Sequence, residues 1–83
     1  MTSPASAKWQ IKGLIKYSLP VFFPDEEEHF RKNLEEKMIS LLDRKKYAEF
    51  RVYIDELESY SESIPDQSYI EHIRDNLAYL DSE

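Results

Sequence analysis

Apolar residues recur with helical spacing along most of the chain after residue 25. A first group falls within one arc of a helical wheel and a second group falls within another: Phe30, Leu34, Met38, Leu41 and Leu42, then Tyr47, Phe50, Ile54 and Leu57. The centres of the two arcs differ by about 160°, so one straight helix would turn its two apolar halves to opposite sides. We therefore predict helices over about residues 25–43 and 46–62, with a turn at residues 43–47.

A third helix is predicted after Pro65. Residues before a proline avoid the helical conformation, so the preceding helix is expected to end by about Ser63. Ser63 and Asp66 are typical of a helix start, and Pro65 suits the first turn. The apolar residues that follow share one helical face: Ile70, Ile73, Leu77 and Leu80. Short connections predict that neighbouring helices are roughly antiparallel.

The stretch SLPVFFPDEEEHF, residues 18–30, changes abruptly from apolar to acidic. Pro20 and Pro24 predict an extended connector between them. Asp25, with Glu28 three residues later, matches a capping box at the start of a helix. The alternative is that this acidic run binds a cation or a basic partner.

Residues 8–17 predict a short amphipathic helix. Three lysines share one face and three aliphatic residues lie on the other side: Lys8, Lys12 and Lys16, against Ile11, Leu14 and Ile15. Gly13, the only glycine, weakens this helix by about 1 kcal/mol relative to alanine. Residues 1–7 are small and polar and are expected to be disordered.

The expected fold is all-α, a small three-helix antiparallel bundle with an N-terminal arm. Residues 1–24 form the basic and apolar arm, and residues 25–83 form the acidic three-helix domain. The arm carries three lysines and no acidic residue, whereas residues 25–83 carry eight basic and seventeen acidic residues, a net charge of 8 − 17 = −9. Phosphates would be repelled by so acidic a body, so direct nucleic-acid binding by it is not expected.

The inventory of reactive residues favours no enzyme chemistry. The chain has no cysteine, which excludes thiolate metal sites and is consistent with a cytoplasmic protein. Glu26 and His29 have the spacing used in di-iron helical bundles, but Tyr69 stands three residues before His72, so the second half of that motif is incomplete. We therefore expect no catalytic residues, no metal and no cofactor.

The aromatic residues are the best candidates for binding a partner. Tyr53 and Tyr60 lie seven residues apart on one side of the second predicted helix, where they either border the core or form a binding strip. The predicted partner-binding residues come from this helix and from the arm: Tyr53, Glu56 and Tyr60, with Trp9, Phe22 and Phe23. The aromatic residues of the arm either fold back onto the bundle, dock on another protein or meet an anionic membrane.

Two stretches resemble known helical families. LLDRKKYAEFRVYIDEL, residues 41–57, resembles a helical hairpin of the tetratricopeptide type, although the glycine and most small alanine positions of that repeat are missing. VYIDELESYSESIPDQSYIEHIRDNL, residues 52–77, is similar to the second and third helices of coactivator KIX domains, without the long loop that precedes those helices. Each likeness covers less than half of the chain, so we assign it to neither family.

We expect a non-enzymatic adaptor or regulator that binds another protein through the aromatic residues of the second helix and the acidic surface. One alternative is an acidic inhibitor, such as an immunity protein, an antitoxin or a mimic of nucleic acid, because dense negative charge can occupy a basic site. A second alternative is a peripheral membrane protein anchored by residues 8–23. Self-association of the chain stays open.

Overall fold

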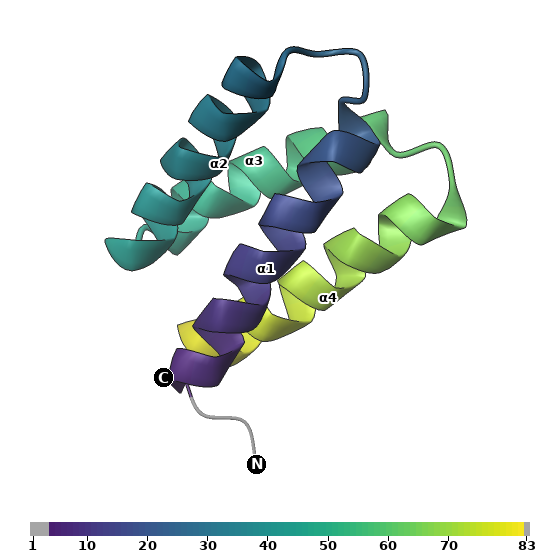
Figure 1. Ribbon diagram of the computed structural model, residues 1–83. Helices are drawn as coiled ribbons and strands as arrows, with labels where there is room; N and C mark the ends of the chain where they lie inside the picture. Colours follow the sequence, from purple (N-terminus) through teal and green to yellow (C-terminus); the bar gives the residue numbers. More distant parts are fainter. Residues whose placement is uncertain (1–3, 83) are drawn as a thin grey trace.

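The computed structural model describes residues 4–82, and within them the chain forms four α-helices joined by short loops. Their bounds are α1 Pro4–Phe22, α2 Glu28–Asp43, α3 Tyr47–Tyr60 and α4 Ile64–Asp81. The helices run alternately in opposite directions, and the start of α1 and the end of α4 lie at the same end of the bundle (Figure 1). The all-α class is confirmed, but the count of three helices with an arm is wrong, because the N-terminal segment is a full helix of the bundle.

A long apolar stripe explains why α1 exceeds the helix predicted over residues 8–17. Every third or fourth residue of its inner face is buried in the core: Ala7, Ile11, Ile15, Leu19 and Phe22. Residues 4–7, expected to be disordered together with residues 1–3, belong to this helix, whereas residues 1–3 lie outside the described part of the chain.

Pro20 lies inside α1, so the extended connector predicted between Pro20 and Pro24 is wrong for its first part. Proline removes one helical hydrogen bond, the one that would reach the carbonyl of Lys16. Pro20 and Lys16 are both exposed, so water can satisfy that carbonyl. Burial of Leu19 and Phe22 offsets the lost hydrogen bond, and the backbone N–H of Phe23 still donates to the Leu19 carbonyl at 2.9 Å.

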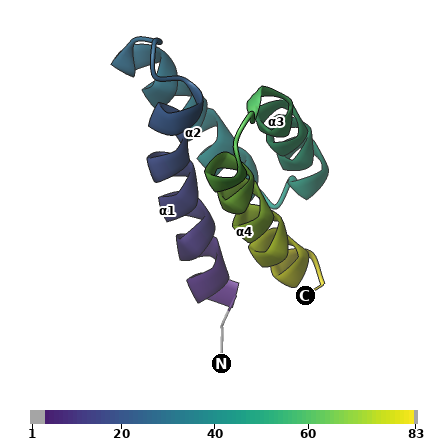
Figure 2. The same ribbon diagram turned by 90° about the vertical axis from the view of Figure 1, so that its right-hand side faces the viewer.

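Within the bundle, α1 packs most extensively against α4, and the contacts α1–α2, α2–α3 and α3–α4 are smaller (Figure 2). The core between the helices is almost entirely apolar. The other three helices contribute nine buried side chains to it: Met38, Leu42, Phe50, Ile54, Leu57, Ile70, Ile73, Leu77 and Leu80. Each of these belongs to one of the apolar stripes that the sequence predicts.

The turn predicted at residues 43–47, between the first and second groups of apolar residues, is confirmed. Two hydrogen bonds close the end of α2, from Lys46 N–H to Leu41 O at 2.9 Å and from Lys45 N–H to Leu42 O at 3.1 Å. This pair is the Schellman arrangement, and it places Lys45 in the left-handed conformation with φ 60°. The break before Pro65 is also confirmed, with Ser63 at the N-cap position, although its side chain makes no capping hydrogen bond.

The predicted start of the acidic helix at Asp25 is wrong by three residues. Helix α2 begins at Glu28, with Glu27 at the N-cap position and no side-chain capping bond. The guanidinium of Arg31 donates instead to the carbonyl of Phe23 at 2.9 Å and to that of Glu26. This arginine, one turn inside α2, therefore holds the preceding residues in a turn and delays the helix.

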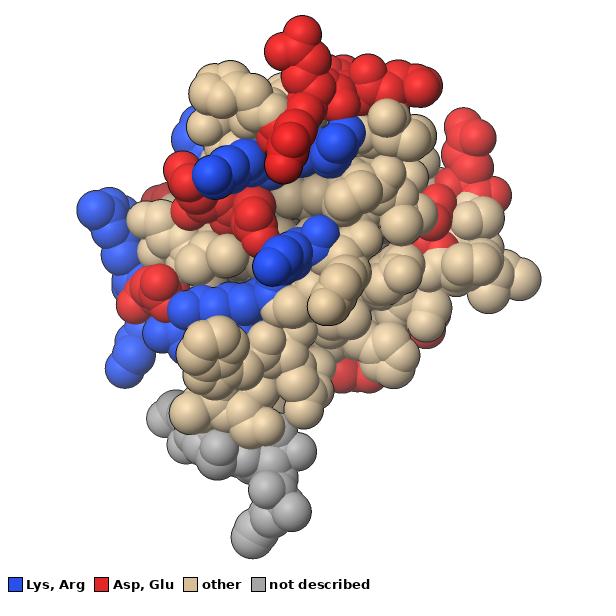
Figure 3. Space-filling model, viewed as in Figure 1, with Lys and Arg blue, Asp and Glu red and all other residues tan. Residues whose placement is uncertain are grey.

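The lysines of α1 approach the acidic part of the chain, as expected for a docked segment. Lys8 and Lys12 both pair with Asp43 at the end of α2, at 2.8 and 3.2 Å. The hydrogen bond from Lys8, with that from Lys12, lowers the pKa of the Asp43 carboxyl below its ordinary value. Figure 3 shows basic side chains gathered on the α2 side of α1, beside a broad uncharged area. No helix in the described residues is long and apolar enough to cross a lipid bilayer.

Candidate functional site: an aromatic strip on α2 and α3

Three aromatic side chains from separate parts of the chain meet at the end of the bundle where α1 leads into α2. The ring of Phe23 lies 5.6 Å from that of Phe30 and 5.3 Å from that of Tyr60, centroid to centroid, and both pairs are edge-to-face. Phe23 is half-buried against the core, whereas Phe30 is 43% and Tyr60 61% exposed. The three rings are thus ordered by their mutual contacts and remain open to solvent on the outer side.

The backbone around Phe23 is fixed from both sides. Its N–H completes the last turn of α1 through Leu19, and its carbonyl accepts a hydrogen bond from Arg31. Phe22 therefore points into the core while Phe23, one residue later, reaches the surface beside α2 and α3. The end of α1 positions both rings, because successive residues of a helix lie about 100° apart.

A shallow hollow of about 620 Å³ continues from Phe30 along α2 and α3. Its lining combines two aromatic rings and a leucine with polar side chains: Phe30, Asn33, Leu34, Glu36, Lys37, Ser40 and Tyr53. Tyr53 is half-buried and packs against the core. We call the four residues Phe23, Phe30, Tyr53 and Tyr60 the aromatic strip, since one surface carries them from the end of α1 to the middle of α3.

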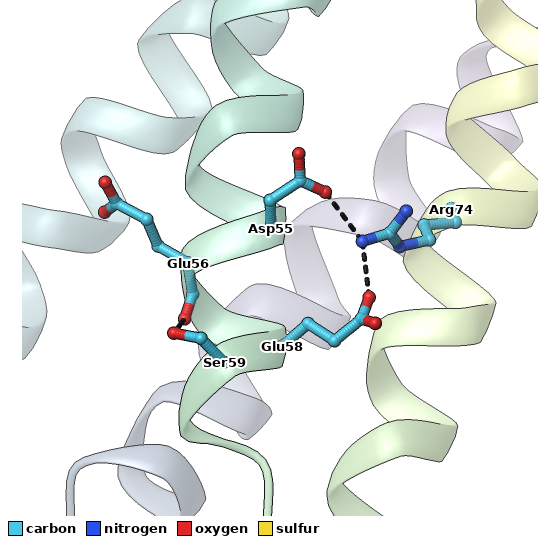
Figure 4. A network of polar contacts seen from close by, with 5 residues as sticks. All are labelled: Asp55, Glu56, Glu58, Ser59 and Arg74. Atoms are coloured by element: carbon cyan, nitrogen blue, oxygen red, sulfur yellow. Dashed lines mark hydrogen bonds and ion pairs between the residues drawn. The ribbon is translucent and has the colours of Figure 1, made fainter.

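Acidic residues border the aromatic strip. Glu36 lines the hollow, and Glu56 lies between Tyr53 and Tyr60 on the same side of α3. In Figure 4 the Glu56 carboxylate points away from Arg74, and within the described residues it forms no ion pair. The acidic stretch of residues 25–28 lies next to the Phe23 end of the strip.

The six residues predicted from sequence to bind a partner do not all come together. Tyr53, Glu56, Tyr60 and Phe23 lie along the aromatic strip. Trp9 lies apart from the strip on the outer side of α1, where it is 72% exposed, and Phe22 is only 9% exposed in the core. Of the alternatives for the aromatic residues of the arm, packing onto the bundle holds for Phe22, which is buried, and in part for Phe23, which is half-buried.

Phe30 is the residue of the aromatic strip that the sequence pattern assigned to the core. Its spacing put it in the apolar arc of the first predicted helix, with the core residues Met38 and Leu42. It lies in the first turn of α2, at the end of the bundle, where the core is narrow and Phe23 occupies the inner position. Its place just after the acidic residues 25–28, in the opening turn of a helix, was a signal in the sequence of an exposed ring.

A second polar feature joins α3 to α4. The guanidinium of Arg74 lies between the carboxylates of Asp55, at 2.7 Å, and Glu58, as Figure 4 shows. A further pair links Arg51 to Asp81 at 2.5 Å. These side chains are exposed, and pairs of this kind contribute about 0–1 kcal/mol each. We interpret them as clamps between neighbouring helices.

The histidine that the sequence singled out takes part in a local contact. The ring of His29 hydrogen-bonds the Asn33 side chain at 3.2 Å, one turn further along α2. Glu26 lies in the loop before the helix, so the helical pairing of Glu26 with His29 does not form. Within residues 4–82 no group of three or more acidic or histidine side chains is arranged to hold a metal ion.

Comparison with protein-family models, curated proteins and solved structures gives no match for this chain. The tetratricopeptide and KIX likenesses therefore gain no support from family membership.

Proposed function

We propose that the protein is a small non-enzymatic adaptor or regulator that binds a partner protein through the aromatic strip. The observation that carries this proposal is the outward-facing cluster of Phe23, Phe30 and Tyr60. Large aromatic side chains in contact with one another and half-open to solvent are the residues that dominate protein interfaces. The hollow beside Phe30 adds a concave surface for an anchoring side chain of the partner.

The energetics favour coverage of these rings. Full burial of a phenylalanine side chain stabilises by about 1.5–3 kcal/mol. Phe30 and Tyr60 are partly exposed in the isolated chain, so they gain only part of this free energy until a partner covers them. The rings are already held by Phe23, so little side-chain freedom is lost when a partner covers them. The aromatic strip is therefore a preorganised binding surface.

The charges around the strip define the chemistry of the partner. Glu36, Glu56 and the acidic residues 25–28 border the apolar centre and outnumber Lys37, which also lines the hollow. A segment with apolar anchors and flanking lysine or arginine residues matches this arrangement. An amphipathic helix with one apolar face is the form of segment that lies in a groove between two helices.

Affinity capture from an extract of the native cell, followed by mass spectrometry, tests the proposal. A double variant, Phe30→Ser with Tyr60→Ser, removes the exposed rings. Val52→Ser is the matched control, because Val52 is an exposed apolar residue of α3 outside the strip. We expect the wild type and the control to retain the same proteins and the double variant to lose them at least about tenfold, a change of about 1.4 kcal/mol.

Equal capture by all three proteins, with circular dichroism showing that the double variant is folded, would exclude the strip as the binding surface.

Salt distinguishes the proposal from an acidic inhibitor. At about 1 M salt the Debye length is about 3 Å, so binding through charge alone would be lost while docking of aromatic rings would persist. Loss of all capture at high salt would therefore favour the inhibitor.

A further inference from the structure

The outer face of α1 carries a second apolar stripe, separate from the one that packs into the core. Its centre is formed by Trp9, Gly13 and Tyr17, which are spaced by four residues. Ala5 and Val21 continue this spacing on the two flanks, about 80° to either side of Gly13. Trp9 is 72% and Tyr17 70% exposed, and Ala5 and Val21 are exposed as well. Figure 2 shows α1 at the edge of the molecule, with α3 and α4 on its inner side. A helix that is apolar on two sides normally has both sides covered.

Gly13 has no role in the fold that explains it. It lies in the middle of a 19-residue helix, its φ is not positive, and a Cβ atom placed there would meet no atom within 4 Å. Glycine disfavours a helix relative to alanine, so the chain bears a cost at this position without a steric reason. A glycine on an exposed face, between two exposed aromatic rings, leaves a notch where another backbone can approach closely.

The outer stripe is nearly symmetric about this glycine. Trp9 and Tyr17 lie four residues to either side of it, and Ala5 and Val21 lie eight residues to either side. A two-fold axis through Gly13 would bring Trp9 of one copy against Tyr17 of the other, with Ala5 and Val21 at the margins of the contact. Interfaces between identical copies require this kind of self-complementary surface.

We propose that the protein forms a two-fold homodimer in which the outer faces of two α1 helices cross in antiparallel orientation at Gly13. Rows of residues four apart interdigitate in the commonest class of helix packing, and a glycine at the crossing point lets the helices come close. Helix α1 packs into the bundle through its opposite, inner face, so dimerisation requires no change in the fold. The dimer uses residues other than the aromatic strip and is independent of the proposed function.

Charge shapes the expected affinity. Each copy has a net charge of −6, so two copies repel each other at long range. Each α1 also brings three lysines and no acidic residue, so the lysines of the two helices repel each other at the interface. Lys8 and Lys12 are partly neutralised by Asp43, and Lys12 also lies 5.4 Å from the centre of the Trp9 ring. Added salt screens the repulsion. Association is therefore expected to strengthen with salt, opposite to the behaviour of an acidic plug.

Sedimentation velocity of the full chain between about 1 µM and about 1 mM, a range that covers weak and moderate affinities, measures the dimer. The emission of Trp9, the only tryptophan, is expected to shift to the blue as the dimer forms. Gly13→Leu is expected to weaken association at least tenfold. Gly13→Ala is expected to raise the melting temperature of the monomer and yet weaken the dimer.

A cysteine variant tests the position of the two-fold axis, since the chain has no natural cysteine. Gly13→Cys is expected to form a disulfide-linked dimer under mild oxidation, because residue 13 of each copy would face its counterpart within the roughly 4.4–6.8 Å between Cα atoms that a disulfide spans. Val52→Cys, on an exposed position of α3, is the control and is expected to form far less of it.

Three outcomes would overturn the dimer. The first is a wild type that stays monomeric over the whole concentration range. The second is association that Gly13→Leu and Gly13→Ala leave unchanged while both variants are folded. The third is a blue shift of Trp9 on phosphatidylserine vesicles by a protein that is monomeric without them, which would assign the outer face of α1 to an anionic membrane surface instead.

Discussion

Lys45 occupies a backbone position that favours glycine, whereas the only glycine, Gly13, occupies a helical position that disfavours glycine. Lys45 adopts the left-handed conformation at the end of α2, where the Schellman arrangement normally takes glycine. The one glycine of the chain instead lies within α1. Residues other than glycine bear a cost of roughly 1–2 kcal/mol in the left-handed region. The hydrogen bonds that close the turn are therefore made against local strain at Lys45.

Lys45→Gly is expected to raise the free energy of unfolding by about 1 kcal/mol, because glycine adopts φ 60° without steric cost. Urea denaturation monitored by circular dichroism measures the change. Arg44→Gly is the control: Arg44 has φ −86°, so glycine brings no conformational gain there and is expected to lower stability. A less stable Lys45→Gly variant would mean that the lysine side chain itself stabilises the turn.

At the scale of the element, α1 shows tertiary packing overriding a local signal. Pro20 and Pro24 read as the limits of an extended segment, yet the helix continues to Phe22. The inner stripe of α1 keeps its spacing through Pro20, so the last turn must stay helical for Leu19 and Phe22 to reach the core. Pro24 lies beyond the helix, where its fixed φ suits the turn.

Pro20→Ala is expected to stabilise the protein, by at most about 3 kcal/mol, because alanine restores the missing N–H and relieves the clash with the preceding turn. The melting temperature reports the effect. Pro24→Ala is the matched control. It is expected to give no gain in stability, because alanine at this position only increases the conformational entropy of the unfolded chain. A destabilised Pro20→Ala variant would show that the proline ring contributes packing at the exposed end of α1.

On the scale of the whole molecule, α1 and α4 form the most extensive contact although they stand at opposite ends of the chain. Five buried residues of α1 belong to the same core as the apolar stripes of the other helices. An 83-residue chain buries only a modest core, so this contribution is a large fraction of the total. Loss of the N-terminal helix is therefore expected to destabilise the bundle as a whole.

Ile15→Ala is expected to lower the free energy of unfolding by about 2–5 kcal/mol, because Ile15 is fully buried between the helices. Gln10→Ala, on the exposed side of the same helix, is the control and is expected to change stability by less than about 0.5 kcal/mol. Chemical denaturation measures both. A loss at Ile15 as small as that of the control would mean that α1 detaches from the bundle in solution.

The sequence by itself determined the all-α class, the three C-terminal helices and the breaks between them. These follow from the phase of the apolar residues and from Pro65, which act over short distances along the chain. It also placed Tyr53 and Tyr60 on one side of a helix. Spacing within a single element carries all of this information.

Only the tertiary structure decided the extent of α1, the delayed start of α2 and the meeting of Phe23, Phe30 and Tyr60. The extent of α1 and the approach of Tyr60 to Phe23 depend on contacts between segments far apart in the sequence, where burial outweighs local preference. The delayed start of α2 depends on the hydrogen bonds that Arg31 donates to the carbonyls of the preceding loop. The separation of Phe22, in the core, from Phe23, at the surface, shows this most clearly. Two identical neighbouring residues carry no local signal that tells them apart, and their surroundings alone give one to the core and the other to the aromatic strip.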